Sequence, residues 1–213
     1  MNLWGELAPV ELMRTLGHIL LALITVGLAP CTHAEQPTAE IRAASDRILG
    51  LLHEPALKTD ARKSERRQLI RQEFDQLVDW ATVARSSLGH HWAKRTRAEK
   101  AEFVDVFSRF LEETFVDKIE TDYGELDKVD YLGEKIIDEY ASVKVQMTTK
   151  DQIAHPVEYR LRKEGKSWRV YDVLIEGVSL VKNYRDQFDE ILAKSSYEKL
   201  VADLRARTPT RAL

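Results

Sequence analysis

The hydrophobic period of this chain changes once, shortly past its midpoint, and that change constrains the fold more than any other feature. Before it, Phe103, Phe107 and Phe110 recur at steps of three and four residues, the spacing of one face of an α-helix. After it, apolar and polar residues alternate over residues 142–148 and 157–162, the spacing of strands with one buried face. We therefore expect a single fold of class α+β.

Helices are predicted on both sides of the strand-forming region, and several carry clear end signals. Thr96 and Glu99 form a capping box, in which each side chain can satisfy the backbone amide of the other residue. Asp79 is a predicted N-cap, and Gly89 and Gly124 are predicted helix ends. The expected helices cover residues 38–53, 60–77, 79–88 and 96–123. A C-terminal helical stretch follows the strands and has two apolar faces. The first is formed by Tyr184, Phe188, Ile191 and Leu192, and the second by Tyr197, Leu200, Val201 and Leu204.

The predicted sheet has about four strands. Three cover residues 142–148, 157–162 and 168–175, and residues 129–132 add a fourth. The connections are short, as in the Glu-Gly-Lys turn of residues 164–166, so an antiparallel meander is expected rather than βαβ units. The segment between Leu132 and Ala141 has no regular alternation, which leaves the pairing of the first strand open.

The first 34 residues have the layout of a secretory signal peptide. Arg14 precedes an apolar run over residues 16–29, and small residues precede a cleavage point after Ala34. The run is shorter than the roughly 20 residues of a spanning helix, so a retained anchor is the less favoured interpretation. Pro30 fits poorly before a lipidated cysteine, so lipidation of Cys31 is not expected. We expect export, with residues 35–213 as one mature domain.

The residue types that most often carry catalysis or metal binding do not form a matching set. His90 and His91 are adjacent, whereas a helix presents two imidazoles to one ion from positions i and i+4, so we expect a polar turn and no metal site. Asp172 and Glu176 are a conceivable acid–base pair, but binding of backbone amides at a strand end and a turn is the favoured interpretation. Ser179 lacks a nucleophile elbow, and the sequence has no glycine-rich phosphate loop. We therefore predict neither an enzyme nor a cofactor.

Charge and the aromatic stripe narrow the class of protein further. The chain has 32 basic and 35 acidic residues, a formal net charge of −3, which argues against a general nucleic-acid binder. Basic residues between positions 62 and 67 share their helix with glutamates and are interpreted as a solvated face. The phenylalanines between positions 103 and 115 build either a solid core or the wall of a ligand pocket, and their spacing alone leaves both open.

Two segments carry a resemblance to a known family. Residues 78–89, followed by Trp92, and the long stretch of residues 170–188 resemble the MlaC (toluene-tolerance) family, and the intervening helix and strand occur in the same order. The resemblance covers residues 40–205, nearly the whole predicted mature chain. The chain departs from the family where it has Val78, Trp80 and Val83 in place of two phenylalanines and a methionine, which keeps apolar character but changes side-chain volume.

The resemblance implies a periplasmic lipid carrier without enzymatic activity. In that family a curved antiparallel sheet, wrapped by helices into a nuclear-transport-factor-like cone, surrounds an apolar pocket for phospholipid acyl chains. Its members carry phospholipid between an outer-membrane lipoprotein complex and an inner-membrane ABC transporter with an MCE-domain subunit, and so maintain outer-membrane lipid asymmetry. A monomer is expected. The residues predicted to line the lipid pocket are Trp80, Val83, Phe107, Phe110, Leu111, Phe115, Val145, Tyr159, Val173 and Tyr184.

Three other functions remain open on the sequence. A related branch of the family is associated with hopanoid lipids, so the cargo class is not fixed. A periplasmic adaptor with a solid core, and a small hydrolase or isomerase, are alternatives from other classes. A cavity of a few hundred Å³ or more favours the carrier over the adaptor, whereas titratable groups converging at the pocket floor favour the enzyme.

Overall fold

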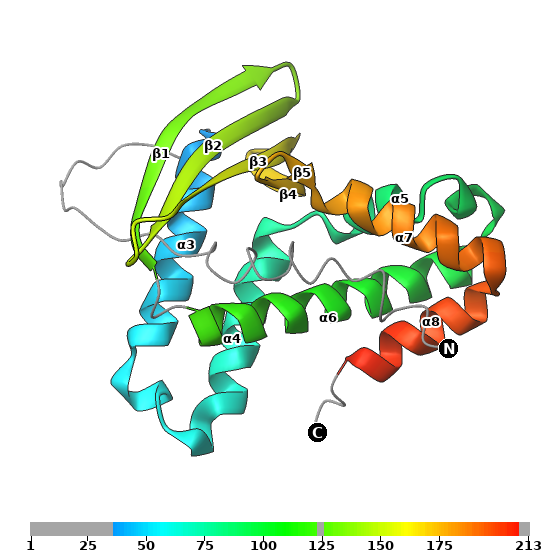
Figure 1. Cartoon of the computed structure of the whole chain (residues 1–213), viewed down its shortest axis with the longest axis horizontal. Helices are drawn as coiled ribbons and strands as arrows, with labels where there is room; N and C mark the ends of the chain where they lie inside the picture. The colour runs from blue at the N-terminus through cyan, green and yellow to red at the C-terminus, as the bar shows by residue number, and fades with distance from the viewer. Residues whose placement is uncertain (1–35, 123–125, 209–213) are drawn as a thin grey trace.

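A computed structural model describes residues 36–122 and 126–208 of the chain (Figure 1). The predicted signal peptide, Cys31 and the predicted helix end at Gly124 lie outside the described residues. Within the described residues, no helix combines the length and the apolar composition needed to cross a membrane.

The predicted helices are confirmed, with small changes at their ends. Asp79 caps α5 by accepting a hydrogen bond from the Thr82 amide at 2.9 Å. The capping box also forms: the Thr96 amide donates to Glu99 at 2.6 Å, and the Glu99 amide donates to Thr96 at 3.2 Å. The helices are α3 (Pro37–His53), α4 (Lys63–Leu77), α5 (Trp80–Leu88), α6 (Arg97–Asp122), α7 (Leu180–Lys194) and α8 (Tyr197–Arg207), with short 3₁₀ helices η1 (Pro55–Leu57), η2 (Asp60–Arg62) and η3 (Gly89–Lys94).

The sheet is an antiparallel meander, as predicted, but it has five strands rather than about four. The strands are β1 (Leu126–Ile137), β2 (Tyr140–Thr149), β3 (Ala154–Glu164), β4 (Ser167–Ile175) and β5 (Val178–Ser179), and each pairs with the next. The extra strand, β5, has two residues. It forms because Glu176 and Gly177, with φ of 50° and 80°, turn the chain tightly back onto β4.

Strand β1 is much longer than the predicted residues 129–132, and the segment from Leu132 to Ala141 forms a hairpin whose register shifts at Leu132. Residues 133–137 pair with β2, and Asp138, at φ of 53°, begins the turn. Every residue from 132 to 140 is exposed, so this end of the hairpin has no buried face. Without a buried face there is no alternation for sequence patterning to detect, and backbone pairing alone defines the strand.

The molecule has a sheet end and a helical end, which the long helix α6 connects (Figure 1). At the sheet end α3 packs on the sheet, and at the helical end α5, α7 and α8 gather around α6. The buried apolar side chains form three clusters rather than one. One lies among α5, α6, α7 and α8, a second covers the sheet, and a third joins α3, α4 and α6.

Candidate ligand cavity

An apolar cavity lies where the three clusters meet, between the sheet and the helices. All but three of its lining residues are aliphatic or aromatic. The wall comprises Ile41, Ser45 and Ile48 of α3; Phe74 and Leu77 of α4; Val78; Trp80 and Val83 of α5; Leu111, Phe115, Lys118 and Ile119 of α6; Tyr159 of β3; Val170, Asp172, Val173 and Ile175 of β4; and Leu180 and Val181 of α7.

The volume of this cavity is about 70 Å³. A site for one water needs about 10–15 Å³ on the same measure, so the space equals that of about five to seven waters. This volume is below the few hundred Å³ that we expect of a lipid carrier and would not expect of an adaptor with a solid core. In this conformation the walls are nearly closed, and the volume alone does not favour the carrier.

The segment between α4 and α5 joins the helices to the sheet beside the cavity. Val78 makes an isolated parallel bridge to Val170, and the Asp79 amide donates to the Val170 carbonyl at 2.8 Å. The free carboxylate oxygen of Asp79 accepts from Arg162 of β3 at 2.8 Å. These contacts fix the start of α5, which brings Trp80 and Val83 to the cavity wall.

Asp172 lies on the same strand as Val170, close to the point where the chain passes through β5 into α7. Its side chain is buried and accepts hydrogen bonds from the Val173 and Val181 amides at 3.0 and 3.1 Å and from the Ser179 hydroxyl at 2.7 Å. Ser179 in turn caps α7 by accepting from the Lys182 amide at 3.0 Å. The interpretation of Asp172 as a residue that binds backbone amides is therefore confirmed, and the carboxylate supports the start of α7.

The polar groups around the cavity are engaged in the structure of its walls. Ser45 donates to the Ile41 carbonyl at 2.8 Å. Burial raises the pKa of Tyr159 far above its usual value, which keeps its hydroxyl uncharged. The described lining residues include neither histidine nor cysteine. The arrangement can hold an apolar group, and it presents no nucleophile–base pair for covalent chemistry.

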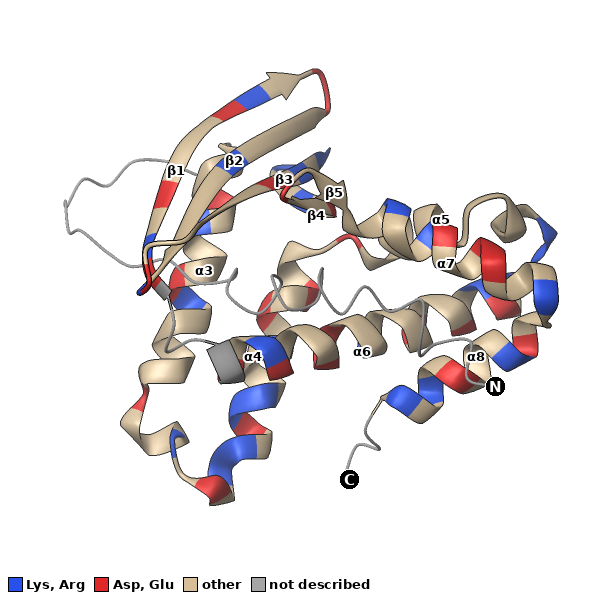
Figure 2. Cartoon of the chain, in the orientation of Figure 1, with Lys and Arg blue, Asp and Glu red and all other residues tan. Residues whose placement is uncertain are grey.

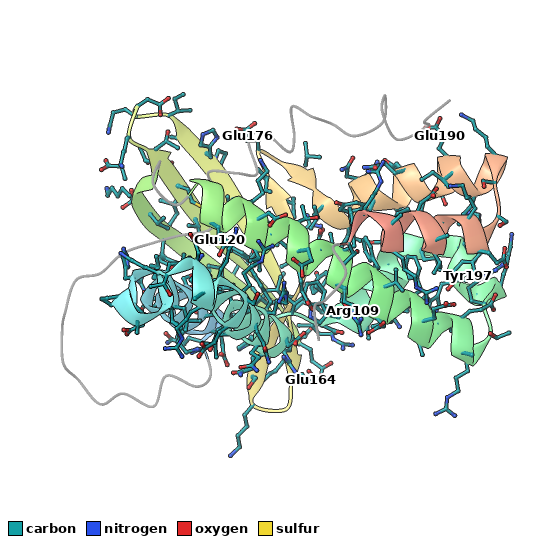
Figure 3. All side chains as sticks on the ribbon, turned by 90° about the horizontal axis from the view of Figure 1, so that it is seen from below. Arg109, Glu120, Glu164, Glu176, Glu190 and Tyr197 are labelled. Carbon is teal, nitrogen blue, oxygen red and sulfur yellow. The ribbon has the colours of Figure 1, made fainter. Side chains whose placement is uncertain are left out.

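Ion pairs join α4 to α6 on the outer side of the cavity wall. Arg66 lies 2.6 Å from Glu120, and Arg67 lies 2.9 Å from Glu113 and 3.1 Å from Glu120. Figure 2 shows basic residues along α4 and acidic residues along α6, and Figure 3 labels Glu120 at the end of α6 beside α4. Tyr197, at the other end of α6, donates to the Glu99 carbonyl at 2.7 Å and holds α8 in place.

The structure brings six of the ten predicted lipid-pocket residues together and leaves four elsewhere. Phe107, Phe110 and Tyr184 pack in the helical cluster, where the Phe107 and Tyr184 ring centres are 5.2 Å apart, and Val145 packs in the sheet cluster. Phe107 and Phe110 do not line the cavity because their rings pack against Tyr184 of α7, and Val145 does not because it packs within the sheet cluster. The six that line it are Trp80, Val83, Leu111, Phe115, Tyr159 and Val173.

Sequence reasoning missed much of the remaining wall. Ile41, Ile48 and Phe74 lie on apolar helical faces that the pattern does reveal. A pattern of this kind indicates that a side chain is buried, but it does not indicate which cluster or cavity the side chain reaches. Leu180 and Val181 carried no signal beyond their apolar character.

A buried carboxyl that no sequence pattern indicated lies just behind this wall. Glu112 of α6 is 7% exposed and is hydrogen-bonded to Asp75. Burial, followed by the charge of Asp75, raises the pKa of Glu112 to about 7. Asp75 also accepts from the Trp80 indole at 3.0 Å, so this pair contacts the cavity through a wall residue.

Comparison with known proteins supports one family. Residues 42–206 match the family model described as MlaC protein. A segment of 55 residues is 33% identical to toluene tolerance protein ttg2D of Pseudomonas putida, and this match spans 26% of the chain and 26% of that relative.

Solved structures support the fold. The phospholipid-binding protein from Ralstonia solanacearum, solved in complex with a phospholipid, aligns with a TM-score of 0.67 at 23% identity over 80% of this chain and 95% of that one. A cyanobacterial iota-carbonic anhydrase complexed with bicarbonate aligns with a TM-score of only 0.36 at 16% identity over 70% of this chain and 96% of that one, too low to support an argument.

Proposed function

The chain belongs to the MlaC protein family, and we propose that it is a carrier that shields phospholipid acyl chains in the cavity between its sheet and its helices. The observation that carries this proposal is the family match over residues 42–206. The structural relative from Ralstonia solanacearum was solved with a phospholipid bound. The apolar cavity at the junction of three clusters supplies the surface that such a ligand needs.

The energetics favour shielding over catalysis. Each methylene moved from a bilayer into water costs about 0.8 kcal/mol, so transfer of a lipid needs continuous apolar walls. At about 70 Å³ the cavity is too small for an acyl chain, so the sheet and helices must move apart when lipid enters. The three clusters are separate units, so their internal packing can persist while the space between them widens.

The proposal extends to location and partners. Residues 1–34 act as a signal peptide, and residues 35–213 work as a single lipid-binding domain in the periplasm. There the protein exchanges lipid with an outer-membrane lipoprotein complex and an inner-membrane ABC transporter that has an MCE-domain subunit, and so maintains outer-membrane lipid asymmetry. It acts as a monomer, with neither a cofactor nor enzymatic activity.

The small cavity favours one alternative, a periplasmic adaptor that binds no lipid. If the walls never open, the aliphatic and aromatic side chains around the cavity are simply core. A hopanoid carrier differs from the main proposal only in its cargo.

Native mass spectrometry with lipid extraction tests the proposal on protein purified from the periplasm without detergent. We expect one co-purified phospholipid per chain. A hopanoid in its place changes the cargo class. An apo mass, together with failure to take up lipid from vesicles, refutes the carrier and leaves the adaptor.

A pair of valine variants tests whether the cavity holds the lipid. Val173 is partly buried on the cavity wall, so Val173→Trp places an indole in the space that an acyl chain needs. Val178 is 46% exposed on β5, and Val178→Trp is the matched control. We expect Val173→Trp to lose bound lipid while its circular dichroism spectrum stays that of the wild type, and Val178→Trp to retain lipid. Equal lipid in both variants would place the ligand elsewhere.

A further inference from the structure

A cluster of potential metal ligands lies at the helical end, away from the cavity. His90 and His91 belong to η3, and Asp189 belongs to α7. One potential ligand atom from each residue lies within 4.8 Å of the others. The two histidines offered no partner in the sequence, and the fold supplies one from nearly 100 residues further along the chain.

Two atoms of this cluster lack the partners that buried polar atoms normally have. His91 Nε2 and Asp189 Oδ1 are both inaccessible to solvent, and neither makes a hydrogen bond within the described part of the chain. They are 3.0 Å apart, close enough for a hydrogen bond, but they do not meet in hydrogen-bond geometry. Buried polar atoms are rarely left in this state, because the desolvation cost is not recovered.

The contact distances fit two ligands of one ion. Imidazole nitrogen and carboxylate oxygen each lie about 2.0–2.2 Å from Zn²⁺, so a ligand–metal–ligand angle between 90° and 110° separates them by about 2.8–3.6 Å. The 3.0 Å between His91 Nε2 and Asp189 Oδ1 falls in this range. His90 Nδ1 lies 3.6 Å from the same oxygen and needs only a small adjustment, and its side chain is 65% exposed and can move.

The Arg185 side chain of α7 packs against the α5–η3 junction and positions these elements independently of the three ligand side chains. Gly89 precedes the histidines with φ of 57°, and a Cβ at this position would lie 3.2 Å from the Arg185 side chain of α7. The Arg185 guanidinium donates through Nε to the Ser86 carbonyl at 2.7 Å. The absence of a side chain at Gly89 therefore allows η3 to approach α7 closely, and the cluster is prepositioned.

We propose that His90, His91 and Asp189 form a surface site for a divalent transition-metal ion such as Zn²⁺. Two imidazoles and one carboxylate suit Zn²⁺, Cu²⁺ or Ni²⁺ better than Mg²⁺ or Ca²⁺, which prefer ligand sets of oxygen alone. The bound ion links η3 to α7, and water completes its coordination on the exposed side.

Isothermal titration calorimetry of tag-free, chelator-treated protein with ZnCl₂ tests the proposal by measuring the stoichiometry and affinity of binding. We expect saturable binding of one equivalent. His91→Ala and the nearly isosteric Asp189→Asn should each weaken binding by about tenfold or more. His53→Ala removes a histidine at the end of α3 and should leave the affinity unchanged.

Thermal unfolding adds a second readout. Zn²⁺ should raise the unfolding midpoint of the wild type and of His53→Ala, because an ion bound only by the folded chain stabilises it, and should have little effect on Asp189→Asn. Failure of the wild type to bind saturably refutes the site. So does an unchanged affinity in both His91→Ala and Asp189→Asn, or an equal loss in His53→Ala.

Discussion

The buried carboxyl of Glu112 predicts an unusual dependence of stability on pH. Its pKa rises from 4.5 to about 7 in the folded chain because burial, and then the charge of Asp75, disfavour the ionised form. Between these values the folded state binds more protons than the unfolded state, so the free energy of unfolding falls as pH rises. The contribution is fully present below pH 4.5 and is lost as pH rises through about 7.

The magnitude follows from the size of the shift. A change from 4.5 to about 7 corresponds to about 3 kcal/mol between the two protonation states. Glu112 also lines a second, polar cleft of about 650 Å³ together with Arg71 and Arg109, so screening by solvent lowers the expected effect to about 2 kcal/mol. Glu112→Gln removes the ionisation, and its amide can donate to Asp75 as the protonated carboxyl does.

Urea unfolding from pH 4.5 to pH 8 measures this effect. We expect Glu112→Gln to match the wild type near pH 4.5 and to be about 2 kcal/mol more stable at pH 8. Glu113→Gln is the matched control on the same helix, and it should be less stable than the wild type at pH 8, because Glu113 is paired with Arg67 and Arg71. The reasoning would be refuted if Glu112→Gln were no more stable than the wild type at pH 8 and its free energy of unfolding changed with pH in the same way as that of the wild type.

Two further changes test the contacts that hold the cavity walls. Asp172→Asn should lower the free energy of unfolding by about 2–3 kcal/mol in urea, since the Val181 amide and the Ser179 hydroxyl lose a charged acceptor; a loss below about 0.5 kcal/mol would contradict this role. Arg67→Ala should cost about 2 kcal/mol, because its side chain is 15% exposed and its loss leaves partners on α6 unpaired. High salt should reduce the difference from the wild type. Arg62→Ala is the control, because it removes only the exposed ion pair between Arg62 and Glu65, and it should have no measurable effect on the free energy of unfolding.

Local signals predicted most of the fold, because they depend on residues close together in the chain. Asp79, Thr96 and Gly89 mark helix ends by hydrogen bonds or backbone angles set within a few residues. The alternation in β2, β3 and β4 reflects one buried face on each strand. The outer half of β1 escaped prediction for the same reason, since its residues are exposed on both faces and nothing alternates.

The candidate cavity was predictable only in part. The pattern on α6 marks Phe107 and Phe115 equally as buried, yet Phe107 packs among the helices and Phe115 lines the cavity. Hydrophobic spacing depends on whether a side chain leaves water, and both do. Which neighbours surround it depends on the crossing of α6 with α5, α7 and the sheet, and no short segment contains that information.

The sequence by itself determined the order of helices and strands, the antiparallel meander and the resemblance to the MlaC family, because each depends on patterns within contiguous segments. Only the tertiary structure decided how nearly closed the cavity is, that Glu112 meets Asp75, and that Asp189 lies beside His90 and His91. These features join residues far apart in the chain. Their geometry is set by packing among several elements at once, and the separate patterns of those elements do not specify it.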